Sequence, residues 1–375
     1  MRKFFEAIFV LSGMIIGVGM FAIPFSFLQA GFWVGAAELA VLSVVVLAMH
    51  LLYGEMVLGT PRFHRMPGYI RLYLGSRAAA VSWASTLFGV IGTLLAYLAV
   101  GALFLSTIFS GAGWNPRPVV WAVLMAGAGG IITFFPLKKA ARINGLLTVF
   151  EIGFIAALAA YLLPNISPAH LTGARPEYLF FPYGVILFAL VGGSVIPDMI
   201  TVLNRGRART RAAIAVGSLI PATLYFFFAL GVVGVSGPLT SQESLAGLQQ
   251  ALGGRIALWG SIAGLLAVFT SFVALEENFE AVLRIDMGAP KRMAWVVAAA
   301  VPLLFYFAGL QDFIAIIAAV GAIGFGVDSA LIILAYRRMR RKRGRPLSLW
   351  FRLGAAVVFL MVSAGVAYEL YRFFM

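Results

Sequence analysis

Two stretches of this chain place glycine and proline in the same order, and such stretches can bind charged groups with their backbone. Val18-Gly19-x-x-x-Ile23-Pro24 matches Val191-Gly192-x-x-x-Ile196-Pro197. Glycine weakens a helix, and proline removes one amide donor and clashes with the preceding turn. Where a helix breaks, its freed N–H groups attract anions and its freed C=O groups attract cations. A pair of such breaks therefore suits a small molecule that carries both charges.

Close helix packing is the alternative role for these glycines. Gly13 and Gly17 lie four residues apart, which fits the small-xxx-small pattern that lets helices approach closely in a membrane. The repeated glycine–proline pattern favours a binding site, because paired interrupted spans at corresponding positions are the best sequence pointer to a transporter's central site.

Acidic side chains inside apolar stretches are a second source of chemistry. An ionisable group within a bilayer is costly and is functional by default. Glu55 and Glu151 are candidate proton carriers, and Glu276 and Glu277 are candidates for lining an inner exit route. For His50, a satisfied polar contact is more typical than a proton relay.

The surrounding chain has the composition of a membrane protein. Of its 375 residues, 62% are hydrophobic and 11% are charged, whereas soluble domains average about 45–50% apolar and about 25% charged residues. This excludes a soluble enzyme, a nucleic-acid-binding domain and a disordered chain. Roughly 20 apolar residues cross a bilayer as a helix. Eleven runs are candidates, near 4–30, 32–58, 79–110, 117–135, 141–163, 180–203, 210–236, 255–284, 292–309, 311–337 and 350–372.

The basic residues predict how these spans are oriented. Alternating the spans from an inner N-terminus places all 28 Lys and Arg residues on the inside except Arg117, Arg175, Arg255 and Arg372. Cytoplasmic loops carry such an excess of positive charge. We therefore expect a multi-pass protein of the cell membrane with a cytoplasmic N-terminus and an extracytoplasmic C-terminus. The net charge of +14 then needs no nucleic-acid partner.

The two matched motifs fall in the first helix of each of two five-helix blocks, 1–163 and 175–337. A block with an odd number of spans re-enters the membrane from the opposite side, so we expect inverted repeats in a single membrane domain. Residues 346–375 supply an eleventh transmembrane helix.

Three segments resemble the amino acid/auxin permease family, especially its bacterial aromatic and hydroxy amino acid branch. They are Gly13–Pro24, Phe188–Gly193 with Pro197, and Glu55-Met56-Val57-Leu58-Gly59-Thr60-Pro61. The resemblance implies an all-α LeuT-type fold, with five plus five inverted helices, an extra helix, and breaks in helices 1 and 6. It also implies secondary transport of amino acids.

The resemblance further implies a substrate site at the two breaks. The substrate carboxylate would bind the amides of Gly17, Val18, Gly19, Met20 and Phe21, and its amine would lie near the carbonyls of Ile15, Phe188 and Ala189, beside Leu190. Thr93 and Tyr97 would close the pocket, and Gly192 and Gly193 would leave room for a side chain. Glu55 resembles a second-helix glutamate that braces the broken sixth helix. Met20 replaces the side-chain oxygen of relatives with two sodium ions, which argues against a second cation site.

A sodium site is implied on the same basis. Ala267, Thr270 and Ser271 lie on one helical face, and Gly13 and Ile16 are their partners in the first helix. Five neutral oxygens suit a hard monovalent cation, whereas a divalent ion usually requires carboxylates. Alternatively, the two hydroxyls bond back to carbonyls of their own helix. The span near 141–163 lacks the central lysine that replaces sodium in some proton-coupled relatives.

We therefore expect a Na⁺-coupled symporter of a neutral amino acid that works by alternating access. No acidic or basic residue is expected beside the breaks, so a charged substrate side chain would lack a partner. A proton-coupled permease or exchanger of the same fold is the alternative, and a passive channel is a further one. A membrane enzyme is disfavoured, because no His/Asp/Glu cluster has metal-ligand spacing, and no other cofactor is expected. No nucleotide-binding motif of a primary pump is present. The oligomeric state is left open.

Overall fold

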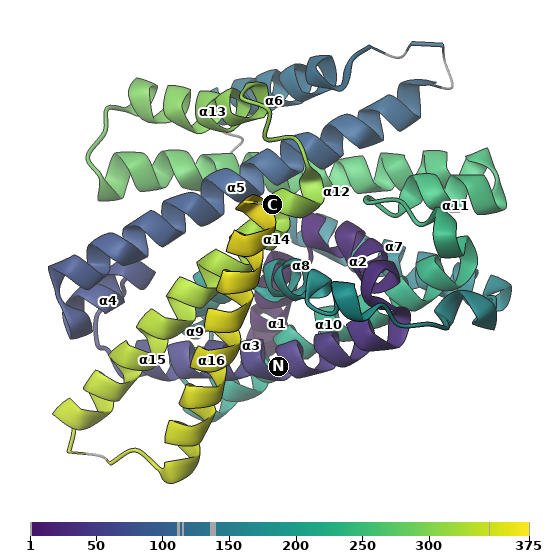
Figure 1. Ribbon diagram of the computed structural model, residues 1–375. Coiled ribbons are helices and arrows are strands. Elements are labelled where there is room, and N and C mark those ends of the chain that lie inside the picture. The colour runs from purple at the N-terminus through teal and green to yellow at the C-terminus, as the bar shows by residue number, and fades with distance from the viewer. Residues whose placement is uncertain (1, 111–112, 115, 136–139, 345, 375) are drawn as a thin grey trace.

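The computed structural model describes residues 2–374 except 111–112, 115, 136–139 and 345 (Figure 1). The side chains of 140–148, 254–257, 350, 370 and 372–374 also lie outside the described set. Several residues of the charge-sidedness prediction therefore lie outside the described residues, namely Lys138, Lys139, Arg142, Arg255, Arg345 and Arg372. Every regular element in the described part of the chain is helical.

The α-helices are α1 (Arg2–Ile15), α2 (Ile23–Ala30), α3 (Phe32–Leu58), α4 (Met66–Leu74), α5 (Ser76–Ser110), α6 (Pro118–Phe134), α7 (Ala140–Leu162), α8 (Phe181–Leu190), α9 (Ile196–Val202), α10 (Arg207–Ser236), α11 (Leu245–Leu252), α12 (Gly254–Ala281), α13 (Lys291–Phe307), α14 (Phe313–Ala319), α15 (Phe325–Lys342) and α16 (Leu349–Phe374). Short 3₁₀ or π segments connect them, namely η1 (Val18–Ala22), η2 (Leu163–Asn165), η3 (Pro168–Leu171), η4 (Pro176–Tyr178), η5 (Gly193–Val195), η6 (Gly237–Leu239), η7 (Val282–Asp286) and η8 (Val320–Gly324).

Seven helical segments are long and apolar enough to cross a bilayer, and α1 with α2 forms an eighth span that is bent by 50°. The predicted spans near 117–135, 141–163 and 292–309 coincide with α6, α7 and α13, which are not in this set. An all-helical membrane protein is thus confirmed, whereas the count of eleven spans stays a prediction.

Helix packing places the two interrupted helices at the centre of the molecule. α10 packs against α1, α3 and α7, and α8 packs against α2, α3 and α14. The long α5 runs diagonally past this group and contacts α12 and α6, while α16 lies at the front against α15 (Figure 1).

Glycines allow the backbone of α8 to lie close to the backbone of α14 and of the π-helical segment η8. A Cβ on Gly184 would press against the Ala318 carbonyl, and a Cβ on Gly321 would press against the Gly184 carbonyl. This contact fixes α8 next to the last span of the second predicted block, and it thereby positions the break that follows α8.

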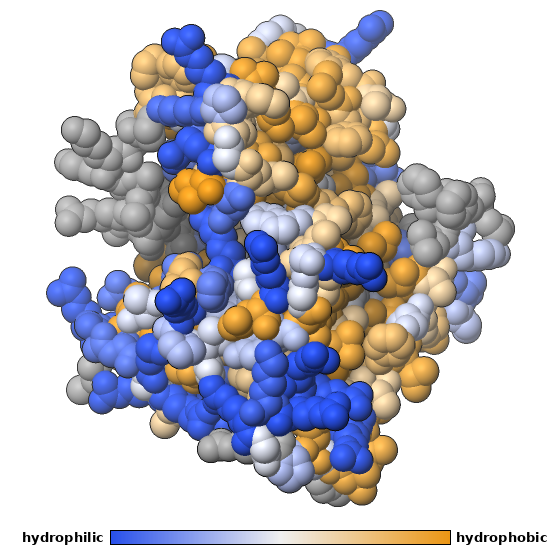
Figure 2. Space-filling model, turned by 90° about the vertical axis from the view of Figure 1, so that its left-hand side faces the viewer, coloured by the Kyte–Doolittle hydropathy of each residue, from blue (hydrophilic) through white to orange (hydrophobic). Residues whose placement is uncertain are grey.

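The loops that were expected to share one side of the membrane lie together. Arg205, after α9, donates to the carbonyls of Val57 and Thr60 at 2.9 and 2.6 Å, and Arg343, after α15, donates to the Gly59 carbonyl. Figure 2 views the side of the molecule that carries α4, and hydrophilic residues cover much of its lower half. Which side of the membrane this face occupies stays a prediction.

Candidate functional site

The first helix breaks at Gly17. Ile16 donates its N–H to the Ser12 carbonyl at 2.8 Å. Among the described residues, the next hydrogen bond of the helical series, from the Gly17 N–H to the Gly13 carbonyl, is not formed. Gly17 is extended, with φ −158° and ψ −159°, and α2 begins after the 3₁₀ segment η1 with Pro24 in its first turn. The break therefore frees backbone groups at its centre.

The sixth span breaks in the same manner. α8 ends at Leu190, and Val191 adopts the extended conformation with φ −73° and ψ 125°. α9 begins at Ile196 with Pro197 in its first turn. The two glycine–proline stretches thus interrupt two helices, as predicted from the sequence.

Glycine lets the two breaks touch. A Cβ on Gly19 would lie 2.9 Å from the Cα of Ala189 and 2.9 Å from the ring of Phe188. A Cβ on Gly192 would lie 2.5 Å from the side chain of Ile15. The space at Gly192 is thus filled by Ile15, so the expectation that this glycine leaves room for a substrate side chain was wrong. At Gly193 a Cβ would have ordinary contacts, the nearest at 3.7 Å.

Tyr225 links the two breaks directly. Its hydroxyl lies 2.8 Å from the Ile15 carbonyl and 3.2 Å from the Ala189 carbonyl. Both carbonyls lie at the ends of the interrupted helices and were predicted to face the substrate amine. Tyr225 is fully buried in α10. Sequence analysis missed it, because one tyrosine in an apolar helix has no distinguishing pattern.

The two predicted residues of α5 differ in their placement. The Tyr97 hydroxyl lies 3.2 Å from where a Cβ on Gly17 would be, and it hydrogen-bonds the Ser271 side chain. The Thr93 hydroxyl instead donates to the Gly89 carbonyl of its own helix at 2.7 Å. Tyr97 therefore lies at the first break, whereas Thr93 bonds within α5.

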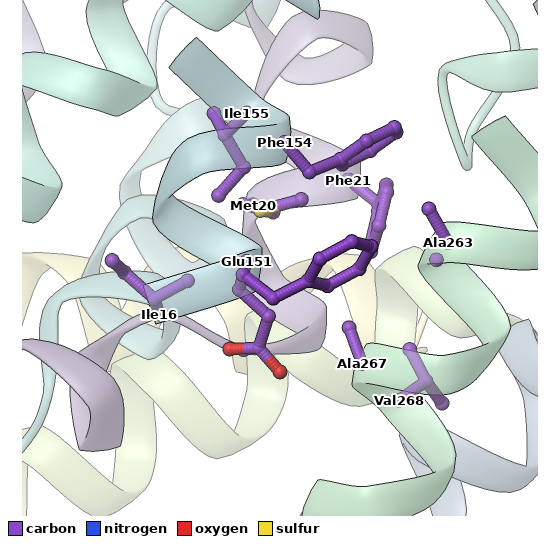
Figure 3. Close-up of a pocket in the computed structure, with 12 residues that line it drawn as sticks. Ile16, Met20, Phe21, Glu151, Phe154, Ile155, Ala263, Ala267 and Val268 are labelled. Atoms are coloured by element: carbon purple, nitrogen blue, oxygen red, sulfur yellow. The ribbon is translucent and has the colours of Figure 1, made fainter. Parts of the chain in front are cut away.

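A small cavity of about 10 Å³ borders the first break (Figure 3). That volume suits about one water molecule, so the surrounding side chains must move before a larger molecule can enter. Phe21 lines the cavity, and its ring packs edge-on against that of Phe104, with the ring centroids 5.0 Å apart. Ser244, which precedes α11, donates to the Phe21 carbonyl at 2.5 Å. Residues from the first break, η1, α7 and α12 line the cavity, namely Ile16, Gly17, Met20, Phe21, Phe150, Glu151, Phe154, Ile155, Ala263, Gly264, Ala267 and Val268.

The residues predicted to bind sodium are only partly assembled. Ile16 and Ala267 line the same cavity, and Ser271 lies near it through its bond to Tyr97. The Thr270 hydroxyl donates to the carbonyls of Leu266 and Ala267 at 2.9 and 3.1 Å. This is the back-bonded arrangement that the sequence left open as the alternative.

Glu151 also faces this cavity. The sequence analysis expected no acidic residue beside the breaks, and Glu151 corrects that expectation. Its carboxylate points between Ile16 and the α12 residues Ala267 and Val268 (Figure 3). The side chain is 7% exposed. The lining of the cavity therefore includes a buried acidic side chain, which α7 supplies.

Glu55 does not brace the sixth span. Its carboxylate pairs with Arg207 at 3.0 Å and with Arg211 at 2.7 Å, both at the start of α10. The bracing contact comes from His50 instead, because its Nε2 accepts the Gly192 N–H at 3.3 Å and its Nδ1 lies 3.0 Å from the Ser218 hydroxyl. An accepting Nε2 places the ring proton on Nδ1, which then donates to Ser218.

Glu276 and Glu277 lie away from the two breaks. The Glu276 carboxylate accepts from Thr133 on α6 at 3.4 Å, and Gly129 of α6 leaves the space that the carboxylate fills. Glu277 is half-buried on the next position of α12. The structure thus packs Glu276 between α12 and α6.

Replacing His50 by leucine should destabilise the protein, because the buried Gly192 N–H loses its acceptor. Leaving such a donor unsatisfied costs about 1–3 kcal/mol. We expect His50→Leu to lower the thermal unfolding temperature in detergent and Ser218→Ala to lower it less. An unfolding temperature of His50→Leu equal to that of the unmodified protein would show that the contact does not hold the break.

The model of the tryptophan/tyrosine permease family matches residues 1–371. The low affinity tryptophan permease of Escherichia coli (strain K12) is 22% identical over 233 residues, which cover 60% of this chain and 56% of that protein. The chain therefore spans about half the length of the curated relatives it matches.

Two solved structures share the fold. MhsT in complex with L-phenylalanine has a TM-score of 0.66 at 16% identity and covers 97% of both chains. The inward-facing conformation of Mhp1 has a TM-score of 0.68 at 17% identity, over 98% of this chain and 88% of that one. These likenesses confirm the expected LeuT-type fold. The family match names tryptophan/tyrosine permeases, which supports the aromatic amino acid branch expected from the sequence but not the name of the amino acid/auxin permease family.

Proposed function

Because the chain belongs to the tryptophan/tyrosine permease family, we propose that it is a Na⁺-coupled symporter of aromatic amino acids. A permease is a transporter and not an enzyme, so we assign the two breaks to substrate binding and not to catalysis. The proposal places the protein in the cell membrane, with its N-terminus in the cytoplasm.

The observation that carries the proposal is the meeting of two helix breaks inside the bundle. The amides at the start of η1, those of Val18 and Gly19, suit a carboxylate, and the carbonyls of Ile15 and Ala189 suit an ammonium group. Irregular backbone at membrane depth is tolerated where it lines a cavity or is buried in protein.

The substrate class is supported by the relatives together with the site. A protein 22% identical to this chain is a low affinity tryptophan permease, and a structural neighbour is in complex with L-phenylalanine. Phe21, Phe150 and Phe154 line the cavity, and rings of this kind can pack against an aromatic substrate once the cavity opens.

Radiolabelled tryptophan uptake by proteoliposomes tests both the substrate and the ion. We expect an inward Na⁺ gradient to drive accumulation and inward K⁺ or H⁺ gradients to drive little. Excess tryptophan, tyrosine or phenylalanine should inhibit uptake, whereas lysine and glutamate should not, because a charged side chain would lose hydration without gaining a partner.

The double variant Thr270→Ala/Ser271→Ala tests the proposed ion site. Without the two hydroxyls, uptake should lose its dependence on Na⁺. Uptake that ignores Na⁺, or Na⁺ dependence that survives this double substitution, would contradict the assignment of the coupling ion. Preferential inhibition by lysine or glutamate would contradict the substrate class.

A further inference from the structure

α4 is a short amphipathic helix that packs against α5 and α15. Its nine residues extend over about 14 Å, which is too short to cross a bilayer. Pro67, Tyr69 and Ile70 are buried against the protein, whereas Arg71 and Leu72 are exposed. A helix that divides its residues in this way is typical of the membrane surface.

The end of α15 places further basic residues beside α4. The Lys342 ammonium lies 5.9 Å from the centre of the Tyr73 ring, and Arg338 lies one helical turn before Lys342. Arg77 follows α4 at the start of α5. Figure 2 views this side of the molecule, and hydrophilic residues gather over its lower half. The α4–α15 basic surface is the set of exposed residues Arg71, Arg77, Arg338 and Lys342.

No carboxylate in the described part of the chain neutralises this surface. The arginines that form ion pairs there are Arg65, Arg207, Arg211 and Arg284. All four lie outside the α4–α15 basic surface, and they already occupy the carboxylates of Asp286, Glu55 and Glu280. The surface therefore offers four positive charges to a partner that carries negative charge.

Apolar side chains are exposed beside these charges. Phe63, three residues before α4, is 53% exposed, and Leu72 is 47% exposed. At the boundary of a bilayer, basic side chains meet the headgroups while apolar side chains enter the acyl region. Free phosphate would contact the charges alone and would leave Phe63 and Leu72 in water. The combination fits a lipid better than a small soluble anion.

We propose that the α4–α15 basic surface binds anionic phospholipid, whose phosphate contacts the basic side chains and whose acyl chains lie beside Phe63 and Leu72. Clusters of about four to eight basic residues next to a membrane-spanning helix attract anionic lipids, and a guanidinium group binds phosphate through two parallel hydrogen bonds. The proposal is independent of the substrate and of the coupling ion.

Hydrogen bonds connect this surface to the end of α3. The Tyr73 hydroxyl lies 2.8 Å from the hydroxyl of Thr60, which follows α3, and Arg343, next to Lys342, donates to the Gly59 carbonyl. A lipid on the surface therefore holds α4, α15 and the end of α3 together. Because a ligand that binds only the folded state stabilises it, anionic lipid should raise the unfolding temperature.

Fluorescence quenching by lipids measures the preference directly. The chain contains no cysteine, so Leu72→Cys can carry a single fluorescent label. In vesicles of phosphatidylcholine and phosphatidylglycerol, with a quenching spin label on the acyl chain of one lipid or the other, the label should show a preference for phosphatidylglycerol of about fivefold or more. High salt should weaken this preference. Leu360→Cys on the apolar α16, where Leu360 is 69% exposed, is the matched control and should show none.

A variant without the charges tests which residues attract the lipid. Arg71→Gln/Arg77→Gln/Arg338→Gln/Lys342→Gln should abolish the preference at the Leu72→Cys label. Four exposed basic residues outside the surface supply a control of equal charge. This control is Arg2→Gln/Arg209→Gln/Lys291→Gln/Arg292→Gln, and it should keep the preference.

Thermal unfolding of the purified protein in detergent completes the test. Phosphatidylglycerol should raise the unfolding temperature of the unmodified protein, and phosphatidylcholine and inorganic phosphate should not. Equal quenching by the two lipids at Leu72→Cys would overturn the proposal, and this comparison needs neither charge variant. A preference that survives the four substitutions would remove these residues from the site. Inorganic phosphate that stabilises as well as phosphatidylglycerol would overturn the lipid assignment in favour of the free anion.

Discussion

Gly19→Val should abolish tryptophan binding while the protein remains folded. A Cβ at this position would lie 2.9 Å from the Cα of Ala189 and 2.9 Å from the ring of Phe188. The backbone of α8 cannot rotate away as a flexible side chain would, so η1 must move away from α8. Overpacking of this kind costs about 1–3 kcal/mol for small additions, so Gly19→Ala should weaken binding by about 5- to 150-fold.

Scintillation proximity binding of tritiated tryptophan to the purified variants measures this effect. Gly127→Val in α6 is the matched control, because a Cβ on Gly127 meets no atom within 4 Å. It should bind tryptophan as the unmodified protein does. Normal binding by folded Gly19→Val would mean that the substrate lies elsewhere.

Tyr225→Phe should weaken tryptophan binding by about 5- to 150-fold. The substitution removes one hydroxyl and leaves the carbonyls of Ile15 and Ala189 without that donor. Leaving buried polar groups unsatisfied costs about 1–3 kcal/mol, and each 1.4 kcal/mol is a factor of about ten in affinity. We expect the cost to appear in binding, because the two carbonyls belong to the two halves of the proposed site.

The same binding assay, with thermal unfolding beside it, separates this role from general stability. Tyr183→Phe is the control, because its hydroxyl donates to a backbone carbonyl, that of Met361, at 3.2 Å. Both variants lose a buried tyrosine hydroxyl, but only Tyr225 contacts the breaks. Equal binding by the two variants would remove Tyr225 from the site.

The breaks themselves could be predicted from the sequence, because glycine and proline act locally on the helix that contains them. Contacts between helices could not, because they depend on how each helix is rotated about its axis. His50 and Glu55 illustrate this point on α3. Five residues separate them, which corresponds to about 140° around a helix. The structure turns His50 toward Gly192 and Glu55 toward Arg207.

The same limit explains the two surprises in the ion site. Nothing in the span near 141–163 indicates that Glu151 faces the first break, because that span is apolar on most of its surface. Thr270 and Ser271 are neighbours and point about 100° apart. Ser271 reaches Tyr97, while the Thr270 hydroxyl bonds to its own helix. Sodium binding there remains a proposal that rests on helix spacing and on the cavity beside Ile16.

A structure of the protein with bound L-tryptophan tests the central claim most directly, namely that the two breaks form the binding site of an aromatic amino acid. We predict that the substrate carboxylate accepts hydrogen bonds from the amides between Gly17 and Phe21. The ammonium group should lie within hydrogen-bonding distance of the carbonyls of Ile15 or Ala189, and Tyr97 should line the opened cavity. Tryptophan bound at another place, with the backbone at both breaks unchanged and free of ligand, would contradict the account.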